Sequence, residues 1–241
     1  EQEKLVALTA EQQSVISQIE QNCGPFLLYG STGSGKTEVY LHTVAAALAA
    51  DPQAQALVLV PEINLTPQLL ARFERRFAPT LGPQAVASLH SGLTEAQRLQ
   101  HWLAAHTGQA RIVLGTRMAV LASLPQLKII VVDEEHDSSY KQEDGVYYSA
   151  RDMAVLRASI GGAQVVLASA TPSVESWVNA GLGKYRRLDL RARYGSAELP
   201  EMGTIDLRHE ETEKGRWISP RLAAEIRARK ERGEQSLLFL N

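Results

Sequence analysis

The sequence contains a single cysteine, Cys23, among its 241 residues. An intrachain disulfide needs two cysteines and a multi-cysteine zinc site needs several, so both are excluded for this chain. No apolar run approaches the roughly 20 residues that a membrane-spanning helix requires. The N-terminal letters EQEKLVALTAEQQ also lack the basic and then apolar order of a signal peptide. These absences predict a protein of a reducing, cytoplasmic environment.

The sequence also lacks an excess of charge of one sign, because 25 lysines and arginines against 27 aspartates and glutamates leave a formal net charge of −2. This balance argues against a protein coated with basic surface, such as a histone-like DNA binder. It does not exclude a motor that follows one nucleic-acid strand, since such a motor needs only a local strip of phosphate contacts and stacking groups. With 44% hydrophobic and 22% charged residues, the composition is that of an ordinary globular protein.

Short apolar, β-branched runs alternate along the chain with stretches of helical apolar spacing. The runs are typical of buried parallel strands, and they lie at 25–30, 56–61, 85–90, 111–116, 127–135 and 164–171. Helical spacing is found between them, at 38–50, 66–77, 94–106 and 149–160. This alternation predicts βαβ units and therefore a doubly wound α/β fold around a parallel sheet.

The pattern changes after about residue 183, where the sequence becomes polar and is punctuated by Gly and Pro. We expect a first domain, a connecting segment with short strands, and the beginning of a second domain, at 1–183, 184–218 and 219–241. In the last part, 219–233 predicts a capped basic amphipathic helix and SLLFLN (236–241) predicts a first buried strand. A domain that ends on its first strand is incomplete, so we expect a piece of a longer protein.

The letters GSTGSGKT match the phosphate-loop pattern G-x-x-x-x-G-K-[ST], and they stand between a predicted strand and a predicted helix. Glycines let the backbone curl so that successive N–H groups point at phosphates, and the helix adds the positive end of its dipole. Lys36 would reach the β- and γ-phosphates, and the Thr37 hydroxyl would bind Mg²⁺. The alternative is a glycine-rich turn without a ligand. The predicted nucleotide contacts are Gly30, Ser31, Thr32, Gly33, Ser34, Gly35, Lys36 and Thr37.

A second pattern, DEEH, follows the apolar run LKIIVV. It places carboxylates at the carboxyl edge of a buried strand, where open α/β sheets bind ligands. Asp133 would hold Mg²⁺, directly or through water, and Glu134 would orient and deprotonate the attacking water. The alternative is an ordinary charged exit from a strand. Together with the phosphate loop, DEEH indicates an ATPase.

DEEH resembles the DExH type of Walker B box, and the letters SAT at 169–171 resemble the S-A-T motif of superfamily 2 helicases. More specifically, DEEHDSSYKQEDGVYYSARDMA (133–154) is similar to a run in the PriA family of primosomal replication-restart helicases. Other stretches resemble that family in order and spacing, namely GSTGSGKTEVYL, LVPEINLTPQ, LHSGLTEAQR, LGTRMAV and LLFLN. The resemblance spans 8–241. It implies a RecA-like ATP-binding lobe and the start of a second lobe, in an ATP-dependent 3′-to-5′ DNA helicase for replication restart and primosome assembly at stalled forks.

The resemblance also assigns roles around the predicted nucleotide site. Gln12, in the letters LTAEQ, would distinguish ATP, although it could equally be an ordinary residue of a helix surface. Ser169 and Thr171 would couple the ATP site to a DNA track. His136 would link the Walker B box to the S-A-T motif.

Two further segments resemble motifs that flank the single strand in related helicases. Pro61, Glu62 and Thr66 fall in motif Ia, and Thr116 with Arg117 falls in motif Ib. Thr66 could equally be only the N-cap of the helix that follows it. The resemblance therefore predicts a DNA track beside the ATP site.

Three of the seven tyrosines, Tyr140, Tyr147 and Tyr148, lie within nine residues after DEEH. One explanation is that the rings pack beneath the loop as a satellite core. The other, which the resemblance supports, is an aromatic-rich loop that senses single-stranded DNA: bases would stack on a ring, and Lys141 and Arg151 would meet phosphate. The letters DSS, KQED and G are those of an exposed loop, so at least one ring should be accessible.

The resemblance implies ATP and Mg²⁺ as cofactors. As partners it implies single-stranded and forked DNA, primosome proteins and single-stranded DNA-binding protein, with no membrane. The family's zinc-binding cysteines and the arginine motifs of its second lobe are not in this chain, so we expect no zinc here and slow turnover by the chain alone. Two other functions stay open: a nucleotide-gated DNA-binding scaffold without strand separation, and a small-molecule kinase, which needs neither DEEH nor S-A-T.

Overall fold

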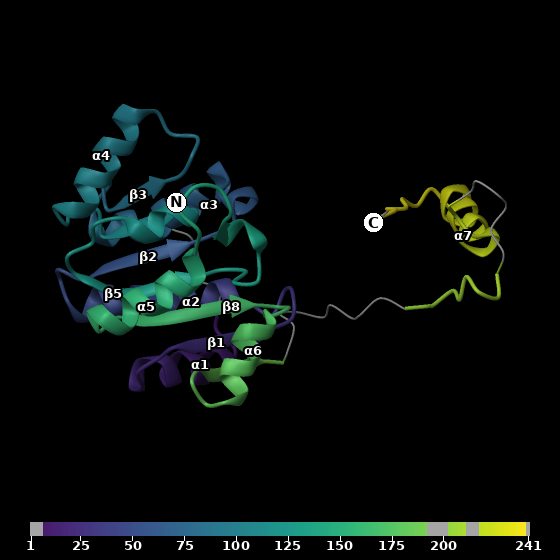
Figure 1. Cartoon of the computed structure of the whole chain (residues 1–241), viewed down its shortest axis with the longest axis horizontal. Helices are drawn as coiled ribbons and strands as arrows, with labels where there is room; N and C mark the ends of the chain where they lie inside the picture. The colour runs from purple at the N-terminus through teal and green to yellow at the C-terminus, as the bar shows by residue number, and fades with distance from the viewer. Residues whose placement is uncertain (1–6, 192–201, 211–216, 240–241) are drawn as a thin grey trace. The chain divides into compact units, whose positions relative to one another are not determined.

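The computed structural model describes residues 7–191, 202–210 and 217–239, and the chain divides into two compact units, Glu1–Ala197 and Glu198–Asn241. In the first unit a seven-stranded sheet lies between helices that cover both of its faces (Figure 1). The strand order is β3-β4-β2-β5-β8-β1-β9, and every neighbouring pair in this sheet is parallel. This architecture confirms the predicted doubly wound α/β fold.

The strands of this sheet are short and, with one exception, coincide with the predicted apolar runs. Their bounds are β1 Phe26–Gly30, β2 Gln55–Leu59, β3 Val86–Leu89, β4 Ile112–Gly115, β5 Leu127–Val132, β8 Gln164–Ser169 and β9 Arg186–Leu190. The exception is β9, which pairs with β1 and lies inside the predicted connecting segment. The sheet of the first unit therefore extends past residue 183.

The helices of the first unit are α1 Ala10–Gln21, α2 Lys36–Ala50, α3 Pro67–Leu81, α4 Glu95–His106, α5 Ala150–Gly161 and α6 Val174–Gly181. Side-chain hydroxyls of the preceding residues cap five of these helices, at Thr9, Thr66, Thr94, Ser149 and Ser173. At α2 the preceding residue is a glycine, and no side chain caps the helix. Within the described residues, no helix is long and apolar enough to cross a membrane.

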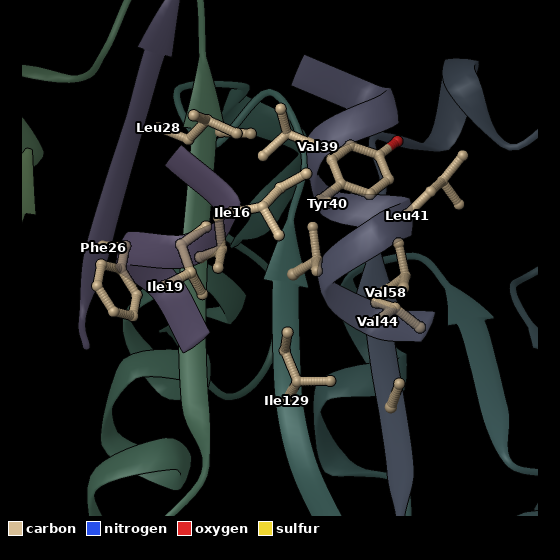
Figure 2. Packing of buried hydrophobic residues seen from close by; sticks show 14 of the residues in the cluster. Ile16, Ile19, Phe26, Leu28, Val39, Tyr40, Leu41, Val44, Val58 and Ile129 are labelled. Atoms are coloured by element: carbon tan, nitrogen blue, oxygen red, sulfur yellow. The ribbon is translucent and has the colours of Figure 1, made fainter. Parts of the chain in front are cut away.

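Successive side chains of the central strands point to opposite faces of the sheet and build two hydrophobic cores. Leu28 and Val58 pack with Ile16 and Val44 of α1 and α2 on one face (Figure 2). Leu27 of β1, Leu57 of β2 and Ile130 of β5 pack with buried residues of α5 on the other face. Because both faces are covered, the strands are continuously apolar rather than alternating. The loops at the carboxyl ends of the strands are thereby set on a rigid support.

The second unit contains α7, Pro220–Glu231, whose N-cap Ser219 accepts a hydrogen bond from the backbone N–H of Leu222. This helix agrees with the predicted one. The strand predicted at its C-terminal side is not formed over 236–239, where Leu237 and Phe239 are exposed. A strand needs a neighbour for its backbone groups, and the described residues of this unit contain no other strand. Residues 240–241 of that prediction lie outside the described residues.

Candidate functional site

The phosphate loop, DEEH and S-A-T follow β1, β5 and β8, which are neighbours in the sheet. Because the three strands are parallel, their carboxyl ends meet at one edge. The three sequence patterns are therefore brought together although they lie apart in the chain, at 30–37, 133–136 and 169–171. Open α/β sheets bind ligands at this edge.

The loop from Gly30 to Lys36 curls through two glycines in the left-handed region, Gly33 with φ 82° and Gly35 with φ 85°. A side chain at Gly35 would also come within 2.1 Å of the Gln12 amide nitrogen. The Lys36 ammonium lies inside the curl and donates to the carbonyl oxygens of Gly30 at 2.8 Å and Ser31 at 3.2 Å. The uncapped start of α2 leaves its backbone N–H groups for an anion, as a phosphate loop requires.

A pocket of about 360 Å³ opens over this loop. It is lined by Gln12, Thr32, Gly33, Gly35, Lys36, Thr37, Glu38, Arg72, Asp133 and Glu134. Its volume lies in the range of small-molecule sites. No group of three or more His, Cys, Asp or Glu side chains suited to a metal occurs in the described residues. Thr37 and Asp133 line the pocket, and Mg²⁺ is usually held in this way, by few protein oxygens together with phosphates and water.

Asp133 stands at the end of β5, where its carboxylate is held from two sides. The Tyr40 hydroxyl donates to one oxygen at 3.1 Å, and the backbone N–H of Glu134 donates to the other at 3.1 Å. Burial, with a further contribution from the charge of Glu134, raises the pKa of Asp133 to about 6. A carboxylate that is costly to ionise here gains from a nearby cation, which suits the predicted metal ligand.

Glu134 has a φ of 46°, the one positive φ of a non-glycine residue in the described chain. An unbranched residue in this conformation costs on the order of 1–2 kcal/mol. The turn places the Glu134 side chain at the pocket, where it stays one-third exposed. Burial lowers the pKa of Lys36, while the charges of Glu134 and Asp133 oppose that shift. The acid pair and the lysine thus face the same space.

His136 bridges DEEH and S-A-T through both ring nitrogens. Its Nδ1 lies 2.7 Å from the Ser169 hydroxyl and its Nε2 lies 3.3 Å from the Thr171 hydroxyl. The same Nδ1 is 3.6 Å from a carboxylate oxygen of Glu134. The predicted link between these motifs therefore exists as a set of direct contacts.

Gln12 is buried, with 3% of its surface exposed, so the alternative of an ordinary helix-surface residue is wrong. Its side-chain oxygen accepts from the backbone N–H of Thr9 at 2.9 Å and completes a capping box at the start of α1. Its amide group donates to the Ser34 carbonyl of the phosphate loop at 3.5 Å and reaches the pocket. Gln12 is thus held against the loop, which is where an adenine-reading residue should lie.

Three of the residues predicted to flank DNA, Glu62, Thr116 and Arg117, line a smaller pocket of about 220 Å³, and Arg117 begins the short helix Arg117–Leu121 of motif Ib. The rest of the lining is Ser91, Met118 and three residues of the tyrosine-bearing loop after DEEH (the tyrosine loop): Ser139, Gln142 and Tyr148. Arg117 donates to the carbonyl oxygens of Ser139 and Lys141 at 3.1 and 2.9 Å. Thr66 is the N-cap of α3, which was the alternative to a role in motif Ia, and it is also exposed.

The tyrosine loop combines both explanations offered for it. Tyr140 is 1% exposed and donates its hydroxyl to the Asp133 carbonyl at 2.6 Å, so this ring packs beneath the loop and is not the accessible one. Tyr147 is 77% exposed and is the accessible ring that the loop letters predicted. Lys141 is exposed, in the two-residue strand β6 Lys141–Gln142, which pairs with β7 Tyr148–Ser149. Arg151 is buried, so it cannot meet phosphate as expected.

The buried partner of Arg151 is Glu135, a residue that the sequence patterns did not single out. The two side chains meet at 3.3 Å, and neither exposes more than 8% of its side chain. Glu135 also accepts hydrogen bonds from the Ser173 N–H at 2.7 Å and from the Ser173 and Ser176 hydroxyls at 3.0 and 2.8 Å. DEEH is therefore fastened to α5 and to the start of α6. Glu135 was visible in the sequence as the second glutamate of DEEH, but its partners were not.

The DEAD/DEAH box helicase family model matches residues 9–179. The replication restart protein PriA of Haemophilus influenzae is 43% identical over 241 residues, covering 99% of this chain and 32% of the relative. The PriA of Bacillus subtilis is 41% identical over 240 residues, covering 97% and 29%. The chain thus spans about a third of the length of these curated relatives. The resemblance to the PriA family is confirmed.

Solved helicase structures share the fold at low sequence identity. MrfA bound to DNA and AMPPNP gives a TM-score of 0.58 at 17% identity, covering 77% of this chain and 27% of that one. RecG bound to a three-way DNA junction gives 0.54 at 21% identity, covering 80% and 25%. By the family match over residues 9–179, the chain belongs to the DEAD/DEAH box helicase family.

Proposed function

We propose that this chain is the ATP-binding lobe of a replication-restart DNA helicase and supplies its hydrolysis site. The observation that carries the proposal is the meeting of three motifs at one edge of the sheet, with His136 in contact with Glu134, Ser169 and Thr171. A pocket that only bound nucleotide would have no need of this connection. The relatives named for replication restart support the cellular role.

In this proposal the residues of the pocket divide the work. The loop N–H groups and Lys36 hold the phosphates, Thr37 and Asp133 hold Mg²⁺, and Gln12 reads the adenine. Bound Mg²⁺ would neutralise phosphate charge during transfer. Glu134 orients the attacking water and accepts its proton.

The DNA side of the proposal rests on the smaller pocket formed by motifs Ia and Ib and the tyrosine loop. We assign single-stranded DNA to this pocket, with Arg117 as its charged group, and to the pocket that shares Gln142 and Tyr148 with it and is lined by Lys141 and Tyr147. Translocation with 3′-to-5′ polarity, action at forks, and contacts with primosome proteins and single-stranded DNA-binding protein belong to the same proposal, as does a cytoplasmic location. The DNA-bound helicases RecG and MrfA share this fold, which supports the proposal.

The test is the ATPase rate of a full-length protein that carries this chain, measured with and without forked DNA. We expect DNA to raise the rate at least about tenfold, which corresponds to about 1.4 kcal/mol in barrier. Lys36→Ala is the control and should abolish both rates. A nucleotide-gated scaffold would hydrolyse ATP at a rate indifferent to DNA, and that result would refute the helicase assignment while leaving the nucleotide site intact.

The 241-residue chain alone should bind nucleotide but hydrolyse it slowly. In related phosphoryl-transfer enzymes an arginine finger contributes roughly 10³–10⁵ in rate, and the family's arginine motifs belong to its second lobe. Rapid multiple turnover by the chain alone would contradict this expectation.

A further inference from the structure

Three charged side chains beside the nucleotide pocket form a cluster that neither the motifs nor the hydrolysis scheme uses. Glu38, the residue after Thr37 in α2, is paired with two arginines of α3. Arg72 donates to one carboxylate oxygen at 3.0 Å and Arg76 to the other at 2.5 Å. A carboxylate between two guanidinium groups is a strong, directional arrangement.

The two arginines differ in access. The Arg76 side chain is 8% exposed and therefore holds Glu38 from the buried side. The Arg72 side chain is 35% exposed and lines the nucleotide pocket together with Glu38. If Arg72 turned toward a ligand, Glu38 would keep its partner Arg76, so the movement would leave no buried carboxylate uncompensated.

Arg72 lines the same pocket as Thr37, Asp133 and Glu134, the residues predicted to hold Mg²⁺ and to activate water. The charge of Arg72 reaches the Tyr40 hydroxyl, where it opposes the rise in the pKa of Tyr40 that burial causes. That hydroxyl is bonded to Asp133 at 3.1 Å. Arg72 is therefore near the carboxylate predicted to hold the metal.

The charges of the residues that line the pocket indicate a role for Arg72. Among the described residues that line it, Lys36 and Arg72 are basic and Glu38, Asp133 and Glu134 are acidic. Lys36 sits within the loop and would reach the β- and γ-phosphates, so a single ammonium group serves both of them. A third phosphate adds negative charge next to the acid pair, and a guanidinium there would offset the repulsion.

We propose that Arg72, held in place by Glu38, contacts the terminal phosphate of a bound nucleoside triphosphate and makes the pocket prefer triphosphate to diphosphate. This inference rests on the proposed nucleotide site. Arg72 belongs to α3, which begins directly after Thr66 of motif Ia. A contact to the terminal phosphate would consequently report the nucleotide state to the helix that starts in the proposed DNA track.

The test compares two nucleotides on the 241-residue chain by calorimetric titration, Mg-ADP and the non-hydrolysable Mg-AMPPNP. For Arg72→Ala we expect AMPPNP affinity to fall about tenfold and ADP affinity to change less than about twofold. Arg72→Lys keeps the charge but not the fork, and it should lose less. Arg75→Ala removes an exposed arginine from the same helix and should change neither affinity.

Equal losses for both nucleotides in Arg72→Ala, or no loss for either, would overturn the inference while the nucleotide site itself stood. If the unmodified chain bound neither nucleotide, the proposed function would fail first and this inference with it. Retained ADP affinity also shows that the Arg72→Ala chain is folded, so a loss confined to AMPPNP cannot be attributed to unfolding.

Discussion

Glu134 and Glu135 are adjacent in the chain and identical in type, yet they lie in opposite environments. Glu134 is one-third exposed at the nucleotide pocket. The side chain of Glu135 has no exposed surface and is enclosed by Arg151, Ser173 and Ser176. The turn at Glu134, with φ 46°, separates the two. One face of DEEH is thus open for chemistry, and the other is fastened to the helices that carry the loop after it.

The difference shows that a motif letter does not define a role. An acid at a strand end can serve as a base only if it stays accessible. An acid buried nearby needs a partner for its charge and hydrogen-bond donors for its oxygens, and Glu135 has both. The enclosed face fixes the position of the open one.

The largest effect should follow from removing the enclosed acid. Glu135→Ala removes the buried acid beside Arg151, which keeps only the exposed Asp152 and Glu175, and it leaves the donors of Ser173 and Ser176 without their acceptor. We expect a loss of about 3–5 kcal/mol in the free energy of unfolding. Urea denaturation of the chain measures it. Glu134→Ala is the matched control and should change stability by less than about 1 kcal/mol. Similar losses in both variants would show that the two faces do not differ.

A substitution at Glu134, the partly exposed acid, should lower the rate of hydrolysis rather than the stability of the fold. Glu134→Gln keeps the size of the side chain but cannot accept a proton, so hydrolysis by a full-length protein should fall at least about 10²-fold. Nucleotide affinity, measured by titration, should stay within about twofold. Hydrolysis within a few-fold of the unmodified protein would remove Glu134 from the role of base.

A smaller effect is expected at Tyr140, the buried tyrosine of the loop after DEEH. Tyr140→Phe removes the hydroxyl that donates to the Asp133 carbonyl, and it should cost about 1–2 kcal/mol in thermal or urea unfolding. Tyr147→Phe, at the exposed ring of the same loop, should change nothing measurable. A neutral Tyr140→Phe would mean that water replaces the lost donor.

The smallest change in stability should come from the exposed ring itself. Tyr147→Ala should alter the free energy of unfolding by less than about 0.5 kcal/mol because the ring is 77% exposed. In a full-length protein it should nevertheless lower the stimulation of ATPase by single-stranded DNA, since a stacked base gains roughly 1–3 kcal/mol. Unchanged stimulation would exclude Tyr147 from the proposed DNA surface.

The helices and strands were predictable where several local features of the sequence agreed. Central strands are apolar along their whole length because both faces are covered, and Thr66, Thr94 and Ser219 are local caps. Several elements escaped this reasoning, and α6 and β9 are two of them. The eight residues of α6 leave Val174 and Trp177 exposed, and β9 (RRLDL) alternates charged residues with leucine at the sheet edge. Neither has the run of apolar residues that marks an interior element.

The site was predictable in its motifs but not in its contacts. The phosphate loop and DEEH carry their chemistry within a few neighbouring residues. The burial of Tyr140 depends instead on where the loop folds back, and the pairing of Glu135 depends on partners 16, 38 and 41 residues further along. The same holds for Glu38, whose arginines follow 34 and 38 residues later. Such contacts follow from the tertiary path, which no local pattern encodes.

The backbone at Glu134 has a consequence for how this protein would evolve in the laboratory. Glycine adopts its φ of 46° without strain, and asparagine does so more readily than glutamate. A library randomised at this codon and selected only for heat resistance should therefore drift to glycine or asparagine. The same library selected for turnover in a full-length protein should return glutamate, so the two selections would pull this single position in opposite directions.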